Sequence, residues 1–231
     1  MSASPQILVL FDIDGTLIHT ARAGLRGMNA AFRRLHGRDH ALDGVSFAGR
    51  TDRAIAADVF RNVGLEPTDA AIVALRDAYL EDLRIEMARP VADPGGVFPG
   101  VPGLLDALEA RDDVAVGLLT GNFAGGAAIK LGHFDLWRRF AFGAFGDDHH
   151  DRRDLVPVAL TRARELGYAV DAASTVIIGD TPLDIDCAHA HGARAIAVAT
   201  GPFTPAQLAH ADLVVETLEA VDAAAVARRW R

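Results

Sequence analysis

Short apolar runs alternate with longer amphipathic stretches along most of the chain. The first run, Ile7–Leu10, is unbroken and partly β-branched, which is typical of a buried strand of a parallel sheet. Five further segments have this character, the second of them weakly: 114–119, 140–145, 175–178, 195–198 and 213–215. Helical patterns separate them at 103–110, 125–132, 155–166 and 183–191. Strands that alternate with single helices predict crossover connections and a Rossmann-like α/β core, a parallel sheet flanked by helices.

The stretch from residue 18 to about residue 92 breaks this alternation. It holds three helical patterns, at 21–36, 53–63 and 68–87, and no convincing strand. The segment 90–102 that follows is rich in Pro and Gly and predicts the return to the sheet. We therefore expect a discontinuous α/β core formed by residues 1–17 and 93–231, and an inserted all-α cap formed by residues 18–92. Because the insertion follows the first strand directly, it can cover the end of that strand as a lid.

Composition sets limits on the class of protein. The chain has 231 residues, half of them hydrophobic, which is ample for a full core. The net charge of −8 argues against a nucleic-acid partner, and no apolar run reaches the ~18 residues of a membrane helix, so we expect no membrane partner. The single cysteine, Cys187, fits a reducing, cytoplasmic location and lies in an apolar-periodic run as a buried small hydrophobe. A monomer and a homodimer are both compatible with the sequence.

Four polar clusters follow predicted strands. They are Asp12-Ile13-Asp14, Thr120-Gly121-Asn122, the segment 146–154, and Gly179-Asp180 with Asp184 four residues later. Parallel strands present their carboxyl ends at one edge of a sheet, so these clusters are expected to meet there. The crowded carboxylates of Asp12 and Asp14 require a nearby cation.

The residue types in these clusters suit phosphate chemistry. Asp12, Asp14 and Asp180 supply hard oxygen ligands of the kind Mg²⁺ prefers. Thr120 offers a hydroxyl, and the backbone amides of Gly121 and Asn122 at a helix start offer an anion cradle. Arg152 or Arg153 adds a fixed positive charge. A metal, a cation, a hydroxyl and a carboxylate around one point describe phosphoryl transfer.

These motifs, in this order, resemble the haloacid dehalogenase-like hydrolase superfamily, and specifically its phosphoglycolate phosphatase-like branch with a helical cap after the first strand. The resemblance rests on Asp12-x-Asp14-Gly15-Thr16, on Thr120 after an apolar strand, on a basic residue, and on Gly179-Asp180-x-x-x-Asp184. Gly49-Arg50-Thr51-Asp52 and Phe98-Pro99-Gly100-Val101 also resemble that branch, so the likeness spans essentially the whole chain.

The resemblance implies roles for individual residues. Asp12 would be the nucleophile that forms an aspartyl-phosphate. Asp14 would protonate the leaving alcohol and then deprotonate the attacking water. Mg²⁺ would be held by the Asp12 carboxylate, the Asp14 main-chain carbonyl and Asp180, with Asp184 as a direct or indirect ligand. Phosphate would be bound by Thr120, Gly121, Asn122 and Arg152.

The chain departs from the family pattern at the third motif, which usually carries a lysine. Lys130 falls in a helical pattern away from the expected place, and Arg152-Arg153 stands there instead. We assign the role to Arg152, with Arg153 as the alternative. In the cap, Arg50 and Thr51 are candidate substrate contacts, although for Arg50 the preferred interpretation is that it is solvated or pairs with Asp52.

The function expected on these grounds is Mg²⁺-dependent hydrolysis of small phosphorylated metabolites through an aspartyl-phosphate. A sugar phosphomutase of the β-phosphoglucomutase type is the nearest alternative, because the same core chemistry can return the phosphoryl group to a sugar hydroxyl. A non-catalytic binding protein on the same fold is a further alternative. It is disfavoured because Asp12 and Asp14 are both present.

Overall fold

A six-stranded parallel sheet forms the centre of the computed structural model, which describes residues 7–229. Its order is β5-β4-β1-β6-β7-β8. The strands are β1 (Ile7–Phe11), β4 (Val114–Leu119), β5 (Gly143–Ala144), β6 (Thr175–Gly179), β7 (Arg194–Val198) and β8 (Leu213–Val215). All six strands expected from the sequence are therefore present. The weakest one, expected at 140–145, pairs over only two residues because it lies at the edge of the sheet beside β4.

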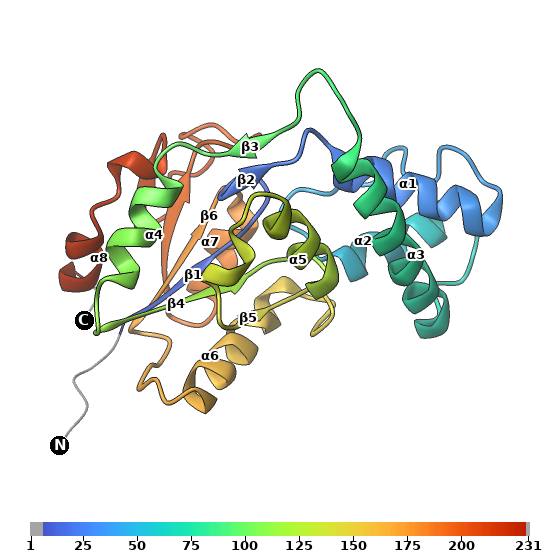
Figure 1. Cartoon of the computed structure of the whole chain (residues 1–231). Coiled ribbons are helices and arrows are strands. Elements are labelled where there is room, and N and C mark those ends of the chain that lie inside the picture. The colour runs from blue at the N-terminus through green and yellow to red at the C-terminus, as the bar shows by residue number, and fades with distance from the viewer. Residues whose placement is uncertain (1–6, 230–231) are drawn as a thin grey trace.

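Helices cover both faces of this sheet (Figure 1). Ile7, Val9 and Phe11 face the cluster formed with α4 (Val101–Glu109), α5 (Ala124–His133) and α8 (Ala223–Arg229). Leu8 and Leu10 face the cluster formed with α6 (Leu155–Glu165) and α7 (Pro182–His189). This alternation is the period of two that a strand imposes on its side chains. Both faces of β1 are buried, which is why its sequence is an unbroken apolar run.

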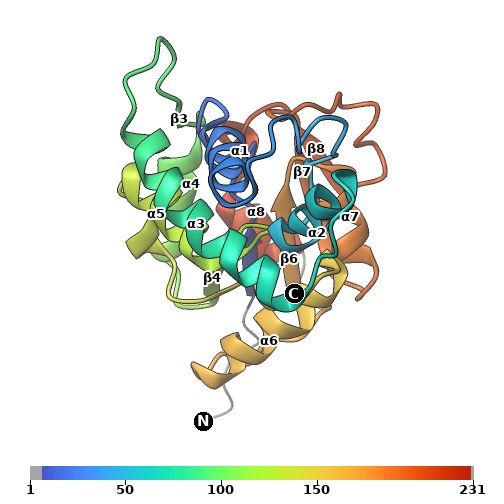
Figure 2. The same cartoon turned by 90° about the vertical axis from the view of Figure 1, so that its right-hand side faces the viewer.

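Three helices between β1 and β4 form a separate hydrophobic cluster. They are α1 (Ala23–His36), α2 (Asp52–Asn62) and α3 (Asp69–Ala88), at the right of Figure 1 and toward the viewer in Figure 2. Phe32, Phe60 and Leu75 lie at the centre of this cluster, and Phe123 from the segment before α5 packs with it. The N-termini of α2 and α3 are capped by the threonine hydroxyls of Thr51 and Thr68. We propose that residues 18–92 form the cap and that residues 1–17 and 93–231 form the catalytic core, of which residues 1–6 and 230–231 lie outside the described part of the chain.

A small antiparallel ribbon joins the helical insertion to the sheet. It consists of β2 (Ile18–His19) and β3 (Gly96–Val97), which the sequence patterns did not predict because each strand has only two residues. Short 3₁₀ helices occur at Trp137–Arg139, Arg152–Asp154 and Leu218–Ala220. Between residues 7 and 229, no helix has both the length and the apolar content that a membrane span requires.

The topology fixes where a ligand can bind. β1 lies between β4 on one side and β6 on the other, so the chain leaves β1 in one direction across the sheet and later returns in the opposite direction. Open α/β sheets bind ligands at the carboxyl ends of the strands beside such a reversal. Three of the four predicted polar clusters follow these central strands, and the fourth, at 146–154, follows the edge strand β5. Helices α1–α3 branch from the same edge of the sheet (Figure 1).

Candidate functional site: an acidic cluster at the carboxyl edge of the sheet

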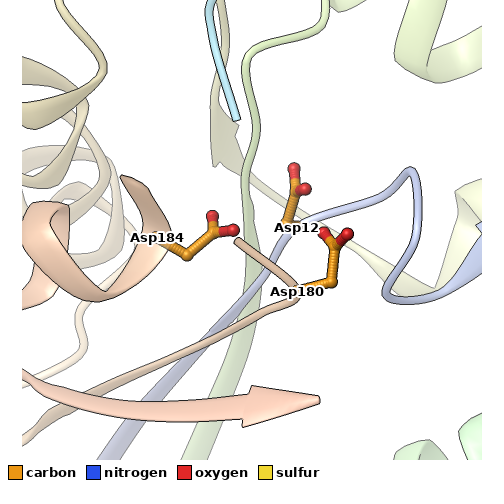
Figure 3. Close-up of side chains that lie close together, drawn as sticks. All are labelled: Asp12, Asp180 and Asp184. Atoms are coloured by element: carbon orange, nitrogen blue, oxygen red, sulfur yellow. The ribbon is translucent and has the colours of Figure 1, made fainter. Parts of the chain in front are cut away.

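Three buried aspartates converge where β1 and β6 end (Figure 3). Asp12 directly follows β1, Asp180 directly follows β6, and Asp184 lies in the first turn of α7. One carboxylate oxygen from each residue lies within 4.8 Å of the others. The sequence predicted this convergence from the strand ends alone.

Burial, with the nearby carboxylates adding to it, raises the pKa values of Asp12 and Asp180. Burial raises the pKa of Asp12 to about 6, with Arg152 opposing the rise and Asp184 adding to it. Burial, together with the negative charges of Asp184 and Asp12, raises the pKa of Asp180 to about 9. Both carboxylates therefore lie in surroundings that disfavour their ionised form, first because they are buried and then because other carboxylates are close.

Asp180 and Asp184 differ in how their oxygens are bound. Asp184 accepts hydrogen bonds from the Thr181 backbone N–H at 3.0 Å and the Thr181 hydroxyl at 2.7 Å, and it pairs with Arg152. The Asp180 carboxylate accepts a 3.4 Å bond from Thr16. It is also enclosed by backbone, since a Cβ at Gly201 would lie 1.7 Å from its Oδ2. The Asp180 side chain is therefore held in place largely by packing. Unlike the oxygens of Asp184, its oxygens accept no short hydrogen bond from a side chain among the described residues.

This donor set fits a hard divalent cation. It consists of carboxylate oxygens only, it is buried, and its electrostatic cost would fall if a cation lay between Asp12 and Asp180. Asp184, whose oxygens already accept bonds from Thr181 and Arg152, fits better as a residue that orients its neighbours than as a direct ligand.

Arg152, and not Arg153, lies at the acidic cluster. The Arg152 side chain is buried, and its Nη2 lies 3.0 Å from Asp12 Oδ1. Its Nη1 donates a 3.1 Å bond to the Gly49 carbonyl in the helical insertion. Arg153 is 62% exposed and pairs with Asp151. Burial would lower the pKa of Arg152, but the charges of Asp12 and Asp184 raise it above its usual value, so this guanidinium is a permanent cation.

Asp14 faces a different partner from Asp12. Its Oδ2 lies 2.6 Å from the Nζ of Lys130 and accepts a 2.9 Å bond from the side-chain amide of Asn122. Lys130 was not predicted to belong to the site, because it lies outside the third motif, yet its Nζ contacts Asp14 there. One signal was available: Gly126, Ala127, Lys130 and Leu131 share the buried face of α5, so the lysine had to point inward.

The segment after β4 carries the expected phosphate-binding groups. Thr120 and Asn122 are buried, and the Thr120 hydroxyl oxygen accepts a 2.9 Å bond from Asn122 Nδ2. At Gly121 the chain runs directly against the helical insertion, because a Cβ there would lie 2.0 Å from the Arg50 carbonyl oxygen. Only glycine permits this approach.

The segment before α2 is fastened to the core. Thr51 donates a 2.7 Å bond to the His150 carbonyl, and the backbone N–H of Asp52 donates a 2.6 Å bond to the Gly121 carbonyl. The Asp52 carboxylate accepts a 2.8 Å bond from the Phe123 N–H. Burial raises the pKa of Asp52 to about 6, and the nearby charge of Lys130 opposes the rise.

Arg50 does not pair with Asp52, contrary to one of the expected alternatives. Its Nη2 instead lies 2.6 Å from Oδ2 of Asp58, which is further along α2. The Asp52 carboxylate is not available to Arg50 because it accepts the hydrogen bond from the Phe123 N–H in the core. Arg50 still lines the cavity described next.

A cavity of about 610 Å³ opens above the acidic cluster. Its floor includes the predicted core residues Asp12, Asp14, Thr120, Asn122, Arg152 and Asp180. Its walls come from the helical insertion and include the apolar side chains of Leu25, Met28, Phe47 and Ile55. The arrangement joins an anion- and cation-binding floor to a largely apolar enclosure, which suits a small polar substrate that must be shielded from water.

Comparisons with known proteins agree with this site. The family model for haloacid dehalogenase-like hydrolases matches residues 9–198. A probable phosphatase, IndB from Dickeya dadantii, is 32% identical over 94% of this chain and 93% of its own length. A phosphoglycolate phosphatase from Rhodospirillum rubrum is 28% identical over 84% of this chain and 79% of its own.

Solved structures show the same fold. A mutant of CbbY from Rhodobacter sphaeroides in complex with xylulose-1,5-bisphosphate superimposes with a TM-score of 0.74. The match covers 93% of this chain and 96% of that one at 21% identity.

Proposed function

The chain belongs to the haloacid dehalogenase-like hydrolase family, and we propose that it is a Mg²⁺-dependent phosphatase of small phosphorylated metabolites. The phosphatase class follows from the family and from relatives that match nearly the whole chain. The observation that carries the finer proposal is the buried cluster of Asp12, Asp180 and Asp184, with Arg152 beside it.

In the proposed reaction, Asp12 is the nucleophile. One Asp12 oxygen attacks phosphorus, the bond from phosphorus to the ester oxygen breaks, and the leaving oxygen takes the proton of the Asp14 carboxyl. Asp14, now ionised, takes a proton from water as the water oxygen attacks the aspartyl-phosphate. Inorganic phosphate leaves, and the Asp12 carboxylate and the Asp14 carboxyl are restored.

The surrounding residues hold the phosphoryl group and its charge. Thr120 donates its hydroxyl, the segment after β4 offers backbone N–H groups, and Arg152 neutralises the oxygens near Asp12. Asp12, Asp180 and the main-chain carbonyl of Asp14 would hold Mg²⁺, which supplies the positive charge that lets an anionic carboxylate approach an anionic phosphate.

The size and lining of the cavity support a small substrate. About 610 Å³, partly enclosed by α1 and α2, leaves room for a metabolite-sized phosphate ester. The four-point attachment of segment 49–52 to the core closes the enclosure near Arg152 and Gly121.

The test is hydrolysis of p-nitrophenyl phosphate and of a panel of phosphorylated metabolites, with and without Mg²⁺. We expect phosphate release that requires Mg²⁺ and is absent in the Asp12→Asn variant. Isomerisation of a hexose 1-phosphate without net phosphate release would instead indicate a mutase. A lack of turnover on every ester would indicate a binding protein.

A further inference from the structure

Lys130 is the single lysine of the chain, against 22 arginines, and it is buried at the site. It lies on α5, outside the motifs that define the family resemblance. Its Nζ lies 2.6 Å from Asp14 Oδ2 and 2.6 Å from Asn122 Oδ1. The Lys130 ammonium thus contacts both Asp14, the proposed acid–base residue, and Asn122 in the segment after β4. The reaction proposed above gives this ammonium no role.

The ammonium fixes the orientation of the Asn122 amide. An ammonium can only donate hydrogen bonds, so the oxygen of the amide must face Lys130 and its NH₂ group must face the other way. That NH₂ group donates to Asp14 Oδ2 at 2.9 Å and to the Thr120 hydroxyl oxygen at 2.9 Å. Lys130 thereby determines that Asp14 Oδ2 and the Thr120 hydroxyl oxygen accept hydrogen bonds from Asn122.

The direction of the Thr120 hydroxyl follows from this arrangement. Its oxygen accepts from the side-chain amide of Asn122 and also, at 3.3 Å, from the Asn122 backbone N–H. A hydroxyl oxygen has two acceptor sites and one proton, so the proton is left to donate elsewhere. Thr120 lines the cavity with Asp12, and its proton is therefore available to a phosphoryl oxygen there.

Asp14 is positioned by the same pair of donors. Lys130 and Asn122 both bind its Oδ2, which anchors the carboxylate by one oxygen. The side chain remains 41% exposed and lines the cavity. The proton that the proposed reaction assigns to Asp14 would therefore lie on Oδ1, the oxygen that these two donors do not bind.

We propose that Lys130 is a positioning residue that sets the hydrogen-bond polarity of Thr120 and the orientation of Asp14 through Asn122. The inference rests on the proposed phosphatase reaction. Helix α5, which carries none of the family motifs, would thereby position both the Thr120 hydroxyl that binds phosphate and Asp14, the acid for the leaving group.

The space around the ammonium explains why a lysine stands here in an arginine-rich chain. A Cβ at Gly24 of α1 would lie 3.3 Å from Lys130 Nζ and 3.4 Å from the hydroxyl oxygen of Tyr79 on α3. A compact ammonium fits beneath these two helices, whereas a planar guanidinium is larger and needs a different set of acceptors. Lys130→Arg is therefore expected to behave as a disruptive change.

The kinetic test compares Lys130→Met with the wild type on two esters. p-Nitrophenyl phosphate has a good leaving group that needs little acid catalysis, whereas an alkyl ester such as glycerol 2-phosphate depends on it. We expect kcat to fall about 10-fold on the aryl ester and about 100-fold or more on the alkyl ester, with KM changed by less than about threefold. In an Asp14→Asn background, the additional loss on the alkyl ester should disappear.

Two outcomes separate this inference from the proposed function. Absence of wild-type turnover on both esters would overturn the phosphatase proposal itself. Turnover by the wild type, with an equal loss on both esters or a change confined to KM in a folded Lys130→Met variant, would overturn the role of Lys130 alone. Thermal unfolding of each variant checks that it is folded.

A spectroscopic measurement keeps the inference testable if Lys130→Met fails to fold. Because the chain has one lysine, ¹⁵N-lysine labelling reports the Lys130 ammonium by itself. We expect a distinct signal with slow hydrogen exchange that shifts in Asp14→Asn and in Asn122→Ala. A rapidly exchanging signal that neither variant moves would contradict the network.

Discussion

Each carboxylate at the site has its own cation or donor set, and this division separates the roles proposed for them. Asp12 is paired with Arg152, and Asp14 is paired with Lys130. Asp180 accepts a weak 3.4 Å bond from Thr16, and its pKa is raised more than that of Asp12. A metal ion near Asp180 would complete the set, because it would supply the charge that the protein does not.

The first prediction concerns the two adjacent arginines. Arg152→Met removes the cation beside Asp12, so we expect kcat on p-nitrophenyl phosphate to fall by about 10²–10³-fold. Arg153→Met is the matched control, because Arg153 is exposed and pairs only with nearby Asp151 among the residues described; its kcat should change by less than about twofold.

Arg152→Lys is the control for a loss of folding, because it keeps a positive charge among the buried carboxylates. It should retain more activity than Arg152→Met. Equal losses in the Arg152 and Arg153 variants would show that the sequence motif has been assigned to the wrong residue.

Side chains that follow an apolar strand were predictable, whereas for Lys130 only its place on the buried face of α5 was predictable, and not its contact with Asp14. Asp12, Thr120 and Asp180 each come directly after a strand of a parallel sheet, and that rule alone places them together. The contact between Lys130 and Asp14 depends on how α5 rotates against the sheet and on the position of Gly24 and Tyr79 above it. No spacing between motifs contains that information.

At the level of elements, the start of α2 links the helical insertion to the catalytic edge. Thr51 has two functions there: its hydroxyl oxygen accepts the Ala54 N–H at 3.1 Å as an N-cap, and its hydroxyl donates to the His150 carbonyl. Thr68 at the start of α3 has the capping function only, with a 3.2 Å bond from the Ala71 N–H.

The paired variants Thr51→Val and Thr68→Val separate these functions. Each should lose about 1 kcal/mol of stability through its cap, seen as a fall in Tm of about 2–4 °C. Only Thr51→Val should also change the kinetics, with kcat/KM on p-nitrophenyl phosphate lowered several-fold, because the attachment to the core is weakened. If the two variants have the same kcat/KM, the attachment of α2 does not contribute to the site.

The sequence placed the long elements well and the short ones poorly. Helices α1–α3 follow helical periodicities of burial, and the central strands β4 and β6 are runs that are buried almost throughout. The ribbon of β2 and β3 was missed, since two residues carry no periodic pattern and the ribbon depends on Ile18 meeting Val97 across the insertion. A helix end was expected at Arg229-Trp230-Arg231, but the start of α8 was not placed, because its run of alanines has little contrast between its faces.

For the whole molecule, the acidic cluster predicts how stability depends on pH and metal. Asp12 and Asp180 have pKa values raised from 3.8 to about 6 and about 9 in the folded state. The folded state therefore binds their protons more tightly, and metal-free protein should lose stability as pH rises from about 4 to about 9. Mg²⁺ competes with these protons, so its stabilising effect should grow over the same interval.

Thermal unfolding at two pH values measures this effect. At about 100 times its Kd, Mg²⁺ should raise Tm by roughly 5–10 °C near pH 8, and by clearly less near pH 5.5. Asp180→Asn should lose most of the Mg²⁺ response while gaining stability without metal at high pH. A Tm that ignores Mg²⁺, or that responds more at the lower pH, would count against a metal at this cluster.

The central claim is that the residue following β1, Asp12, becomes covalently phosphorylated during turnover. The most direct measurement is to quench the protein with acid during turnover of p-nitrophenyl phosphate, stabilise any acyl-phosphate by borohydride reduction, and locate the modification by peptide mass spectrometry. We expect modification of the peptide that contains Asp12 in the wild type, and none in Asp12→Asn. Modification of a different residue, or steady turnover with Asp12 never modified, would contradict it.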